Sequence, residues 1–224
     1  IKSKLVLIFH NNPLALGGSK SIRERNDLIE KCEKLIFVSG WVKEKFFEGL
    51  ERKNHTKCEI IYPSINPIKK FPTKKKIISF VGKLNRSKGF HLFGSVIVKI
   101  LNKYKDWKGI VIGDEQRDKI NFHHERLQNL GFLEHKKVLN VFKKTSIAVA
   151  CSRWNEPFGR TSLEGSANAC AVIISNRGGL PETVTNAIIL KNLNQKELKN
   201  KIELLIKNKK LRLSYQKLAY KNFY

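Results

Sequence analysis

Several features that would quickly identify a protein class are missing from this chain of 224 residues. It contains no methionine, and no apolar run approaches the roughly 20 residues that an α-helix needs to span a bilayer. Cysteine is scarce, with no Cys-x-x-Cys spacing and no accompanying histidine cluster. A disulfide framework and a metal site are therefore disfavoured, and a reduced cytoplasm is the expected setting for Cys32, Cys58, Cys151 and Cys170.

Both ends of the chain point to a longer protein. The first residue is not methionine, residues 1–9 read directly as a strand, and residues 218–224 still follow a helical pattern. We therefore expect the sequence to be an interior piece of its parent protein. Hydrophobic residues make up 41% of the chain, which is enough to fill a core, so wholesale disorder is not expected.

Acidic residues are few, at 19 against 44 basic ones, which gives a formal charge of +25. Such a charge suits nucleic-acid binding, but 34 of the basic residues are lysine, 10 are arginine, and the lysines are spread along the chain. Specific nucleic-acid binders concentrate arginine, because it reads guanine and phosphate bidentately. We expect no nucleic-acid partner, although a basic nucleic-acid-binding domain stays open as an alternative. Attraction to an anionic membrane, by about 1 kcal/mol per basic residue near the lipid, is also expected.

The first 62 residues alternate strand and helix patterns. Strands are predicted at 5–9, 35–39 and 59–62, and helices at 19–32 and 41–50. Between residues 63 and 76, three prolines alternate with lysines, which forbids a helix and predicts a solvated segment because the lysines repel one another. We therefore divide the chain into a first domain, a linker and a second domain, at residues 1–68, 69–76 and 77–224.

The second domain repeats the alternation more clearly. Its short, continuously apolar runs are typical of parallel strands buried on both faces, and they lie at 77–81, 110–112, 147–150 and 171–174. Helical patterns separate them, as at residues 93–101, where apolar residues are spaced by three and four. Strands separated by helices imply right-handed crossovers and an open, doubly wound sheet. Such sheets bind ligands at the carboxyl ends of their strands, so we expect the site in the loops after Val81, Ile112, Ala150 and Ile174.

The loop after residue 150 is the most informative part of the sequence. A Pro-Phe-Gly turn at 157–159 leads into a helix that begins near Arg160. The first amides of a helix have no intrahelical partner and lie at the positive end of its dipole, so they form a phosphate site. Gly159 lets the backbone approach a phosphate closely, because it has no Cβ.

Two glutamates flank this turn. Glu164 lies about 7–8 Å further along the helix, at ~1.5 Å per residue, and this distance suits a diphosphate and the ribose of the same nucleotide. Glu156 precedes the turn and would face the other side of the diphosphate, where a sugar would lie. Either glutamate alone is better explained as a surface acid at an ordinary helix start. The two together, eight residues apart around the turn, favour a binding site.

This arrangement resembles the family-4-like retaining glycosyltransferases of the GT-B fold, whose signature in this turn is Glu, seven residues, Glu. The resemblance implies an α/β fold with two Rossmann-like, doubly wound parallel-sheet domains, of which the first is incomplete here. It also implies that Glu156 contacts the donor sugar as a catalytic residue and that Glu164 binds the ribose. The amides around Phe158, Gly159 and Arg160 would hold the diphosphate of the donor.

The loop after residue 81 fits the same family. The departing diphosphate must be neutralised, and without a metal or another cofactor that falls to lysine and arginine. The family has Gly-Arg-Leu here, followed shortly by Lys-Gly. Lys88 matches and is predicted to be catalytic and diphosphate-binding, whereas Lys83 replaces the arginine, lacks its bidentate fork and is predicted as a weaker diphosphate contact. Arg86 would compensate. By themselves, these residues would be better explained as a solvated lysine loop before a helix.

Shorter segments resemble the family as well. Phe132 and Leu133 belong to a segment whose backbone would face the nucleobase, and residues 178–182 match a Gly-Gly-x-Pro-Glu turn near the site. His10 corresponds in position to a histidine that faces the donor sugar, so a catalytic role is predicted, although a lone histidine after a strand is more often structural. The loop at 17–20 is a weaker candidate for acceptor or phosphate contact.

The resemblance implies transfer of a hexose from a UDP- or GDP-sugar to a hydroxyl, with retention and without a metal or cofactor. The acceptor is expected to be a saccharide or a lipid-linked molecule in cell-envelope polysaccharide or lipopolysaccharide synthesis. The expected place is the cytoplasm, with peripheral contact at the inner face of the membrane. Besides nucleic-acid binding, two alternatives stay open: a nucleotide-sugar-binding protein without activity, and a related phosphorylase, in which Glu164 would have no ribose to bind.

Overall fold

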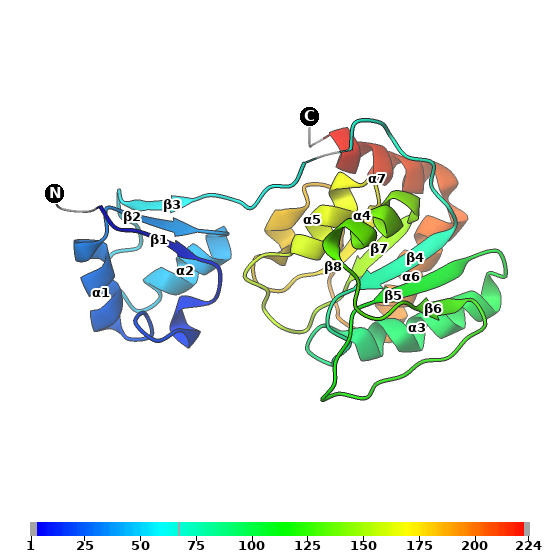
Figure 1. Cartoon of the computed structure of the whole chain (residues 1–224), viewed down its shortest axis with the longest axis horizontal. Helices are drawn as coiled ribbons and strands as arrows, with labels where there is room; N and C mark the ends of the chain where they lie inside the picture. Colours follow the sequence, from blue (N-terminus) through cyan, green and yellow to red (C-terminus); the bar gives the residue numbers. More distant parts are fainter. Residues whose placement is uncertain (1–3, 67, 222–224) are drawn as a thin grey trace.

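The structure is a computed structural model that describes residues 4–66 and 68–221. Two α/β units are joined by an extended segment (Figure 1). The predicted opening strand therefore falls partly outside the described residues, at 1–3, and so do Pro67 of the linker region and the last predicted helical residues, 222–224.

The first unit is a parallel three-stranded sheet in the order β1-β2-β3, with strands at Val6–Phe9, Lys34–Phe37 and Cys58–Ile60. Its helices are α1 and α2, at Ile22–Lys31 and Gly40–Phe47, with a 3₁₀ turn, η1, at Pro13–Ala15. A capping box begins α1, in which Ser21 accepts from the Glu24 amide and Glu24 accepts from the Ser21 amide. The predicted strands and helices of this region are thus confirmed, within a few residues at their ends.

The helices pack on one face of this first sheet. Leu35 and Phe37 of β2 are fully buried beneath them, and Phe37 stacks on Phe9 with ring centroids 5.3 Å apart. On the other face, Val6 and Ile8 of β1 are each 49% exposed. Among the described residues, only one face of this sheet is therefore closed by helices.

The second unit is a parallel six-stranded sheet in the order β6-β5-β4-β7-β8-β9. These strands lie at Leu127–Asn129, Lys108–Ile112, Ile77–Val81, Ile147–Ala150, Ala171–Ser175 and Ile188–Leu190. The four predicted apolar runs are the four central strands, and β8 is buried along its whole length. The chain order reverses between β4 and β7, which is the switch point where ligands bind in open α/β sheets.

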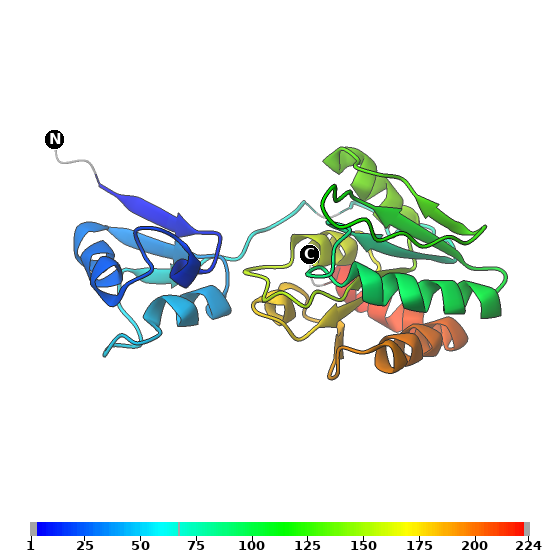
Figure 2. The same cartoon turned by 90° about the horizontal axis from the view of Figure 1, so that it is seen from below.

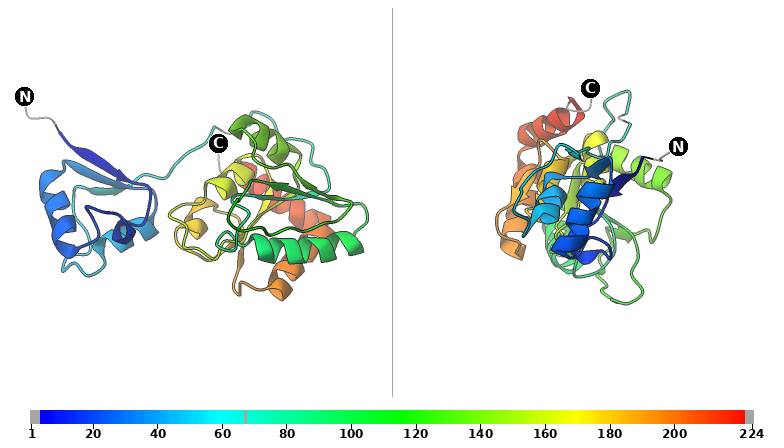
Figure 3. Two further views of the ribbon diagram at one scale, coloured as in Figure 1. Left: turned by 60° about the horizontal axis from the view of Figure 1, so that its bottom comes forward. Right: turned by 90° about the vertical axis from the view of Figure 1, so that its left-hand side faces the viewer.

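Helices cover both faces of the second sheet (Figures 2 and 3). One face packs against α3 and α6, at Phe90–Lys103 and Gln195–Lys207, and the other against α4 and α5, at His135–Lys144 and Arg160–Ala167. A 3₁₀ turn, η2, spans Leu180–Thr183, and α7 spans Lys209–Lys221. The predicted α/β fold with Rossmann-like parallel sheets is confirmed, and doubly wound packing is seen in the second unit.

The lysine-rich segment before β4 is less solvated than predicted. The Lys74 ammonium reaches the ends of α4 and α5, where it donates to the carbonyl oxygen of Phe142 at 2.9 Å and to that of Asn168. Burial lowers the pKa of Lys74. The expectation that mutual repulsion keeps every lysine of this segment in water is wrong for Lys74, because helix-end carbonyls lack intrahelical partners and attract an ammonium.

Candidate functional site

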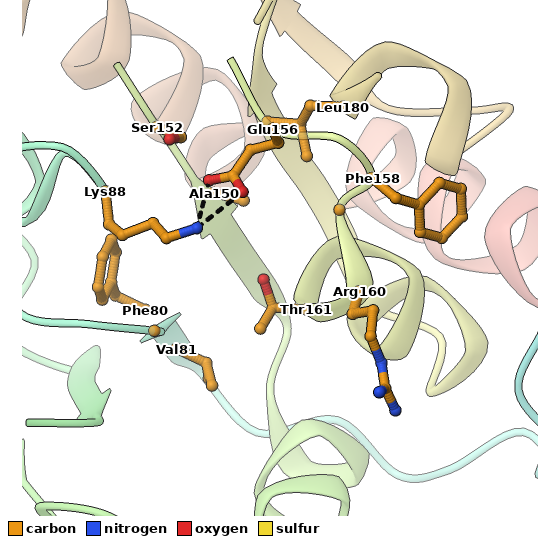
Figure 4. A pocket seen from close by; sticks show the side chains of 12 residues that line it. Phe80, Val81, Lys88, Ala150, Ser152, Glu156, Phe158, Arg160, Thr161 and Leu180 are labelled. Atoms are coloured by element: carbon orange, nitrogen blue, oxygen red, sulfur yellow. Dashed lines mark hydrogen bonds and ion pairs between the residues drawn. The ribbon is translucent and has the colours of Figure 1, made fainter. Parts of the chain in front are cut away.

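A cavity of about 210 Å³ opens at the switch point, between the carboxyl ends of β4 and β7. Its walls come from the ends of these strands, from the loops that follow them and from the start of α5 (Figure 4). Five of the predicted site residues line it: Lys88, Glu156, Phe158, Gly159 and Arg160. Three of the four predicted loops, those after Val81, Ala150 and Ile174, therefore meet at this cavity, whereas the loop after Ile112 contributes none of its lining residues.

The centre of the cavity is an ion pair between Lys88 and Glu156. The ammonium lies 2.7 Å from both carboxylate oxygens, and the Glu156 side chain is only 12% exposed. The loop that carries Lys88 turns at Gly89, whose φ is 78° and where a Cβ would stand 1.9 Å from the Cys151 carbonyl oxygen. This close approach requires glycine and fixes the lysine loop against the end of β7.

The helix α5 begins at this cavity without a side-chain cap. Its first amides have no intrahelical partner, so they are available to an anion. Thr161 lies on the side of the ion pair, whereas the side chains of Arg160 and Phe158 point away from it (Figure 4). Gly159 also makes room for η2 beside the helix start, because a Cβ there would stand 2.2 Å from the Leu180 Cδ1. Its predicted close approach to a phosphate stays a prediction.

Glu164 lies outside the residues that line the cavity and is buried on α5. One of its carboxylate oxygens lies 3.1 Å from the Nε2 of His135, the first residue of α4, and 3.9 Å from an Arg160 guanidinium nitrogen. His135 was not predicted as a site residue, because nothing in its sequence surroundings indicates that α4 starts beside α5. The ribose-binding role of Glu164 stays a prediction.

Two residues of the lysine loop, Asn85 and Arg86, form polar contacts with the loop after β5. The Asn85 amide donates to Glu115 at 3.0 Å, and the backbone amide of Arg86 donates to Asp118. Hydrogen bonds from Arg117 and Asn85 lower the pKa of Glu115 to about 2. Lys83 is exposed and does not line the cavity, so its predicted diphosphate contact remains untested.

The aromatic and apolar residues predicted for the nucleotide lie in different surroundings. Phe132 is 75% exposed, whereas Leu133 packs against the apolar cluster beneath α4. The ring of Phe158 lies 6.3 Å from that of Tyr62, which belongs to the segment after β3. The nucleobase role of the Phe132 and Leu133 segment stays a prediction.

The predicted residues of the first unit stand apart from the cavity lining. His10 follows β1 and is exposed. In the loop at 17–20, the Ser19 hydroxyl is buried and donates to the Pro13 carbonyl, and the Gly18 amide donates to Glu24. These bonds give the loop a structural role at the start of α1, and the catalytic role of His10 stays a prediction.

The four cysteines are free and buried, and burial raises the pKa of the Cys151 thiol to about 12. Within residues 4–66 and 68–221, no group of three histidine, cysteine, aspartate or glutamate side chains is placed to hold a metal ion. No helix in that same part of the chain is long and apolar enough to cross a membrane.

Comparison with known proteins identifies the family. The model of the family described as "Glycosyl transferases group 1" matches residues 63–222, which is more than half of the chain. Spore coat protein SA of Bacillus subtilis (strain 168) is 29% identical over 123 residues, covering 49% of this chain and 33% of that protein. The lipopolysaccharide core biosynthesis mannosyltransferase LpsB of Rhizobium meliloti (strain 1021) is 29% identical over 121 residues, covering 50% of this chain and 34% of that protein.

Solved structures agree on the fold. Anabaena Alr3699/HepE in complex with UDP-glucose superposes with a TM-score of 0.79 at 17% identity, covering 98% of this chain and 67% of that one. The matches cover between 33% and 59% of the lengths of the first curated relatives. The fold is that of the GT-B glycosyltransferases, as the sequence predicted, and the chain belongs to the glycosyl transferases group 1 family.

Proposed function

We propose that the cavity at the switch point binds the diphosphate and sugar of a UDP- or GDP-sugar, and that the parent protein transfers the hexose to a hydroxyl with retention. The observation that carries this proposal is the Lys88–Glu156 pair, held 2.7 Å apart beside the uncapped start of α5. A cation, free helix amides and a carboxylate at one place are the groups that a sugar diphosphate needs.

Binding would exchange the partners of this pair. Phosphate oxygens compete for the Lys88 ammonium and accept hydrogen bonds from the first amides of α5, at the positive end of its dipole. Glu156 then becomes free to accept hydrogen bonds from the sugar hydroxyls. The ion pair thus keeps both groups in place before the donor arrives, so little reorganisation is needed on binding.

The nucleoside would extend from α5 towards α4. Glu164 would accept hydrogen bonds from the two ribose hydroxyls, and the segment that contains Phe132 and Leu133 would lie against the base. The part of Glu164 that faces His135 is already bonded in the free protein.

The chemistry requires no general base from the chain. The bond between the anomeric carbon and the phosphate oxygen breaks, and its electron pair leaves with the diphosphate. The acceptor hydroxyl attacks the same face of the sugar, and its proton passes to the departing phosphate oxygen. Lys88 and the α5 amides stabilise the charge that develops on this diphosphate, so no metal or cofactor is proposed. His10 would position the sugar from the first unit.

For the acceptor, we propose a saccharide or a lipid-linked molecule of envelope polysaccharide or lipopolysaccharide synthesis. The similarity to LpsB, named a lipopolysaccharide core biosynthesis mannosyltransferase, supports this class. The formal charge of +25 would favour peripheral contact with the anionic inner face of a membrane, on the cytoplasmic side.

Calorimetric titration with UDP and GDP in the presence of a chelator tests the proposal. We expect one nucleotide to bind, and its binding to weaken when Lys88 is replaced by alanine. A folded chain that binds neither nucleotide would contradict the donor site. Nucleotide binding without sugar transfer by the full-length parent protein would favour the alternative of a non-catalytic nucleotide-sugar-binding protein.

A further inference from the structure

A carboxylate of the second unit accepts three hydrogen bonds from the first unit. Glu182, in η2, accepts from the amides of Gly40 and Trp41 at 2.6 and 2.9 Å. The Tyr62 hydroxyl donates to the same carboxylate at 3.1 Å. All three donors lie 120 to 142 residues away along the chain, so Glu182 joins two segments of the first unit to the second.

The Glu182 carboxylate binds the start of α2. Gly40 and Trp41 are the first two residues of this helix, so their amides have no intrahelical partner and favour a negative charge. A Cβ on Gly40 would stand 3.0 Å from a Glu182 carboxylate oxygen. Glycine at this position therefore allows the carboxylate to come within hydrogen-bonding distance without a clash.

A second contact lies beside the first. Ser39, the N-cap of α2, donates through its hydroxyl to the Pro157 carbonyl oxygen at 2.6 Å. A Cβ on Gly179 would stand 2.4 Å from that carbonyl oxygen and 2.6 Å from the Ser39 hydroxyl. The start of α2 thus lies directly against two turns of the second unit, the Pro-Phe-Gly turn at residues 157–159 and the turn at residues 178–182.

These contacts reach the candidate site through the backbone. The Gly179 amide donates to the Glu156 carbonyl oxygen at 2.6 Å, and Glu156 forms a parallel bridge with Gly178. The residue that carries the cavity carboxylate and the turn that carries Glu182 are therefore one hydrogen-bonded unit. Movement of the first unit that displaces this turn would therefore also displace the backbone of Glu156.

We propose that Glu182 is a positioning residue that holds the two units closed, by binding the start of α2, and so fixes the first unit over the loop that carries Glu156. The link to sugar transfer rests on the proposed function, whereas the closure itself does not. In the described part of the chain, hydrogen bonds from Ser39, Gly40, Trp41 and Tyr62 join the first unit to the second, and Glu182 is exposed. Relative domain motion is the default for an interface of this kind. Loss of one carboxylate should then shift the population between closed and open forms.

The distance between the units tests this proposal without nucleotide. Spin labels are attached to Arg23→Cys on α1 and Asn200→Cys on α6, two exposed positions, and the distance distribution is measured by double electron–electron resonance. The four native cysteines are buried. We expect Glu182→Ala to lower the ratio of closed to open forms about tenfold, which corresponds to ~1.4 kcal/mol. Glu182→Gln, which keeps one acceptor oxygen, should give an intermediate ratio.

Glu197 provides a matched control. It is a carboxylate that accepts from two backbone amides, those of Lys191 and Asn192, at 2.7 and 2.6 Å, but it lies wholly within the second unit. Glu197→Ala should leave the distance distribution unchanged. Circular dichroism establishes that each variant is folded.

An unchanged distribution in a folded Glu182→Ala variant would overturn the proposal, and so would an equal shift in Glu197→Ala. Either result leaves the nucleotide titration unaffected. Conversely, absence of nucleotide binding would overturn the proposed donor site while a shifted distribution in Glu182→Ala alone still supports closure by Glu182. The two failures are therefore distinguishable.

Discussion

The two units share a parallel-strand plan and differ in how completely they bury their sheets. In the first, helices close one face, and Val6 and Ile8 are each 49% exposed on the other. In the second, helices close both faces, and β8 is buried from Ala171 to Ser175. All residues that line the switch-point cavity belong to the second unit. The second unit therefore buries both faces of its sheet and provides the whole lining of the candidate site, and the first unit donates hydrogen bonds to Glu182 in η2.

The largest effect should follow the loss of the lysine in the cavity. We expect Lys88→Ala to weaken binding of UDP or GDP about 100-fold, or ~2.7 kcal/mol, because a diphosphate loses its charge-assisted hydrogen bonds. Lys83→Ala is the control, since Lys83 is exposed and outside the cavity lining, and its effect should be smaller. Calorimetry measures the affinity of both variants. A larger effect of Lys83→Ala than of Lys88→Ala would mean that the diphosphate binds outside the cavity.

A smaller effect is expected at the second glutamate of the motif. Glu164→Gln should weaken nucleotide binding about tenfold, because an amide accepts fewer hydrogen bonds from ribose hydroxyls than a carboxylate. Binding of inorganic pyrophosphate, which has no ribose, should not change. Glu134→Gln, at an exposed acid just before α4, serves as the control in the same titrations. If Glu164→Gln weakened the binding of nucleotide and pyrophosphate equally, the ribose-binding role of Glu164 would be contradicted.

The stability of the second unit should depend on the linker. Lys74→Ala should lower the free energy of unfolding by about 1–3 kcal/mol, because the carbonyls of Phe142 and Asn168 lose a buried donor. The neighbouring Lys75 is exposed and serves as the control. Lys75→Ala should change the free energy of unfolding by less than about 0.5 kcal/mol. Urea unfolding gives both values. Equal effects of the two substitutions would mean that the segment is solvated, as its composition suggested.

The pH dependence of stability should reflect the lowered pKa of His91, which lies on α3. Burial, then the nearby Arg153 and Arg86, lower the pKa of His91, against the smaller opposite effect of Asp118. A histidine with a lowered pKa in the folded state contributes stability that is present above its unfolded value, near 6.5, and is lost as pH falls through the folded value. His91→Gln should therefore lose less stability than the wild type between pH 7 and pH 5, measured by urea unfolding at each pH. A steeper loss in the variant would contradict this.

The smallest effect should follow removal of the first unit. Residues 69–224 retain the whole cavity lining together with Lys74, and we expect them to fold and to bind the nucleotide within about twofold of the affinity of the whole chain. Analytical ultracentrifugation and calorimetry check both points. A tenfold weaker binding would show that the first unit completes the nucleotide site and would break the comparison drawn above.

Much of this arrangement was predictable from local sequence. The continuously apolar runs gave the four central strands of the second sheet, because strands buried on both faces leave no place for polar side chains. The edge strands β6 and β9 were not predicted. Each has only three residues, some of them exposed, so neither shows a hydrophobic pattern long enough to recognise. The meeting of Lys88 and Glu156 followed from placing two loops at the carboxyl edge of one sheet.

Other contacts between distant segments could not be predicted from the sequence. His135 lies beside Glu164 and Glu182 lies beside Gly40 only because of tertiary packing, and neither pair shares a spacing that a pattern can detect. Lys74 was misjudged for another reason: composition indicates that a lysine run is solvated, but one ammonium on a flexible stem can reach buried carbonyls while its neighbours stay in water.

The central claim, that a nucleotide diphosphate binds at the start of α5 in the second unit, is tested most directly by amide chemical shifts. The whole chain, labelled with ¹⁵N, is titrated with the nucleotide that binds in calorimetry. We predict the largest shifts at the amides of residues 160–162, with further shifts in the loop at 82–89. Shifts spread over the lysine-rich surface, with none at 160–162, would contradict the account.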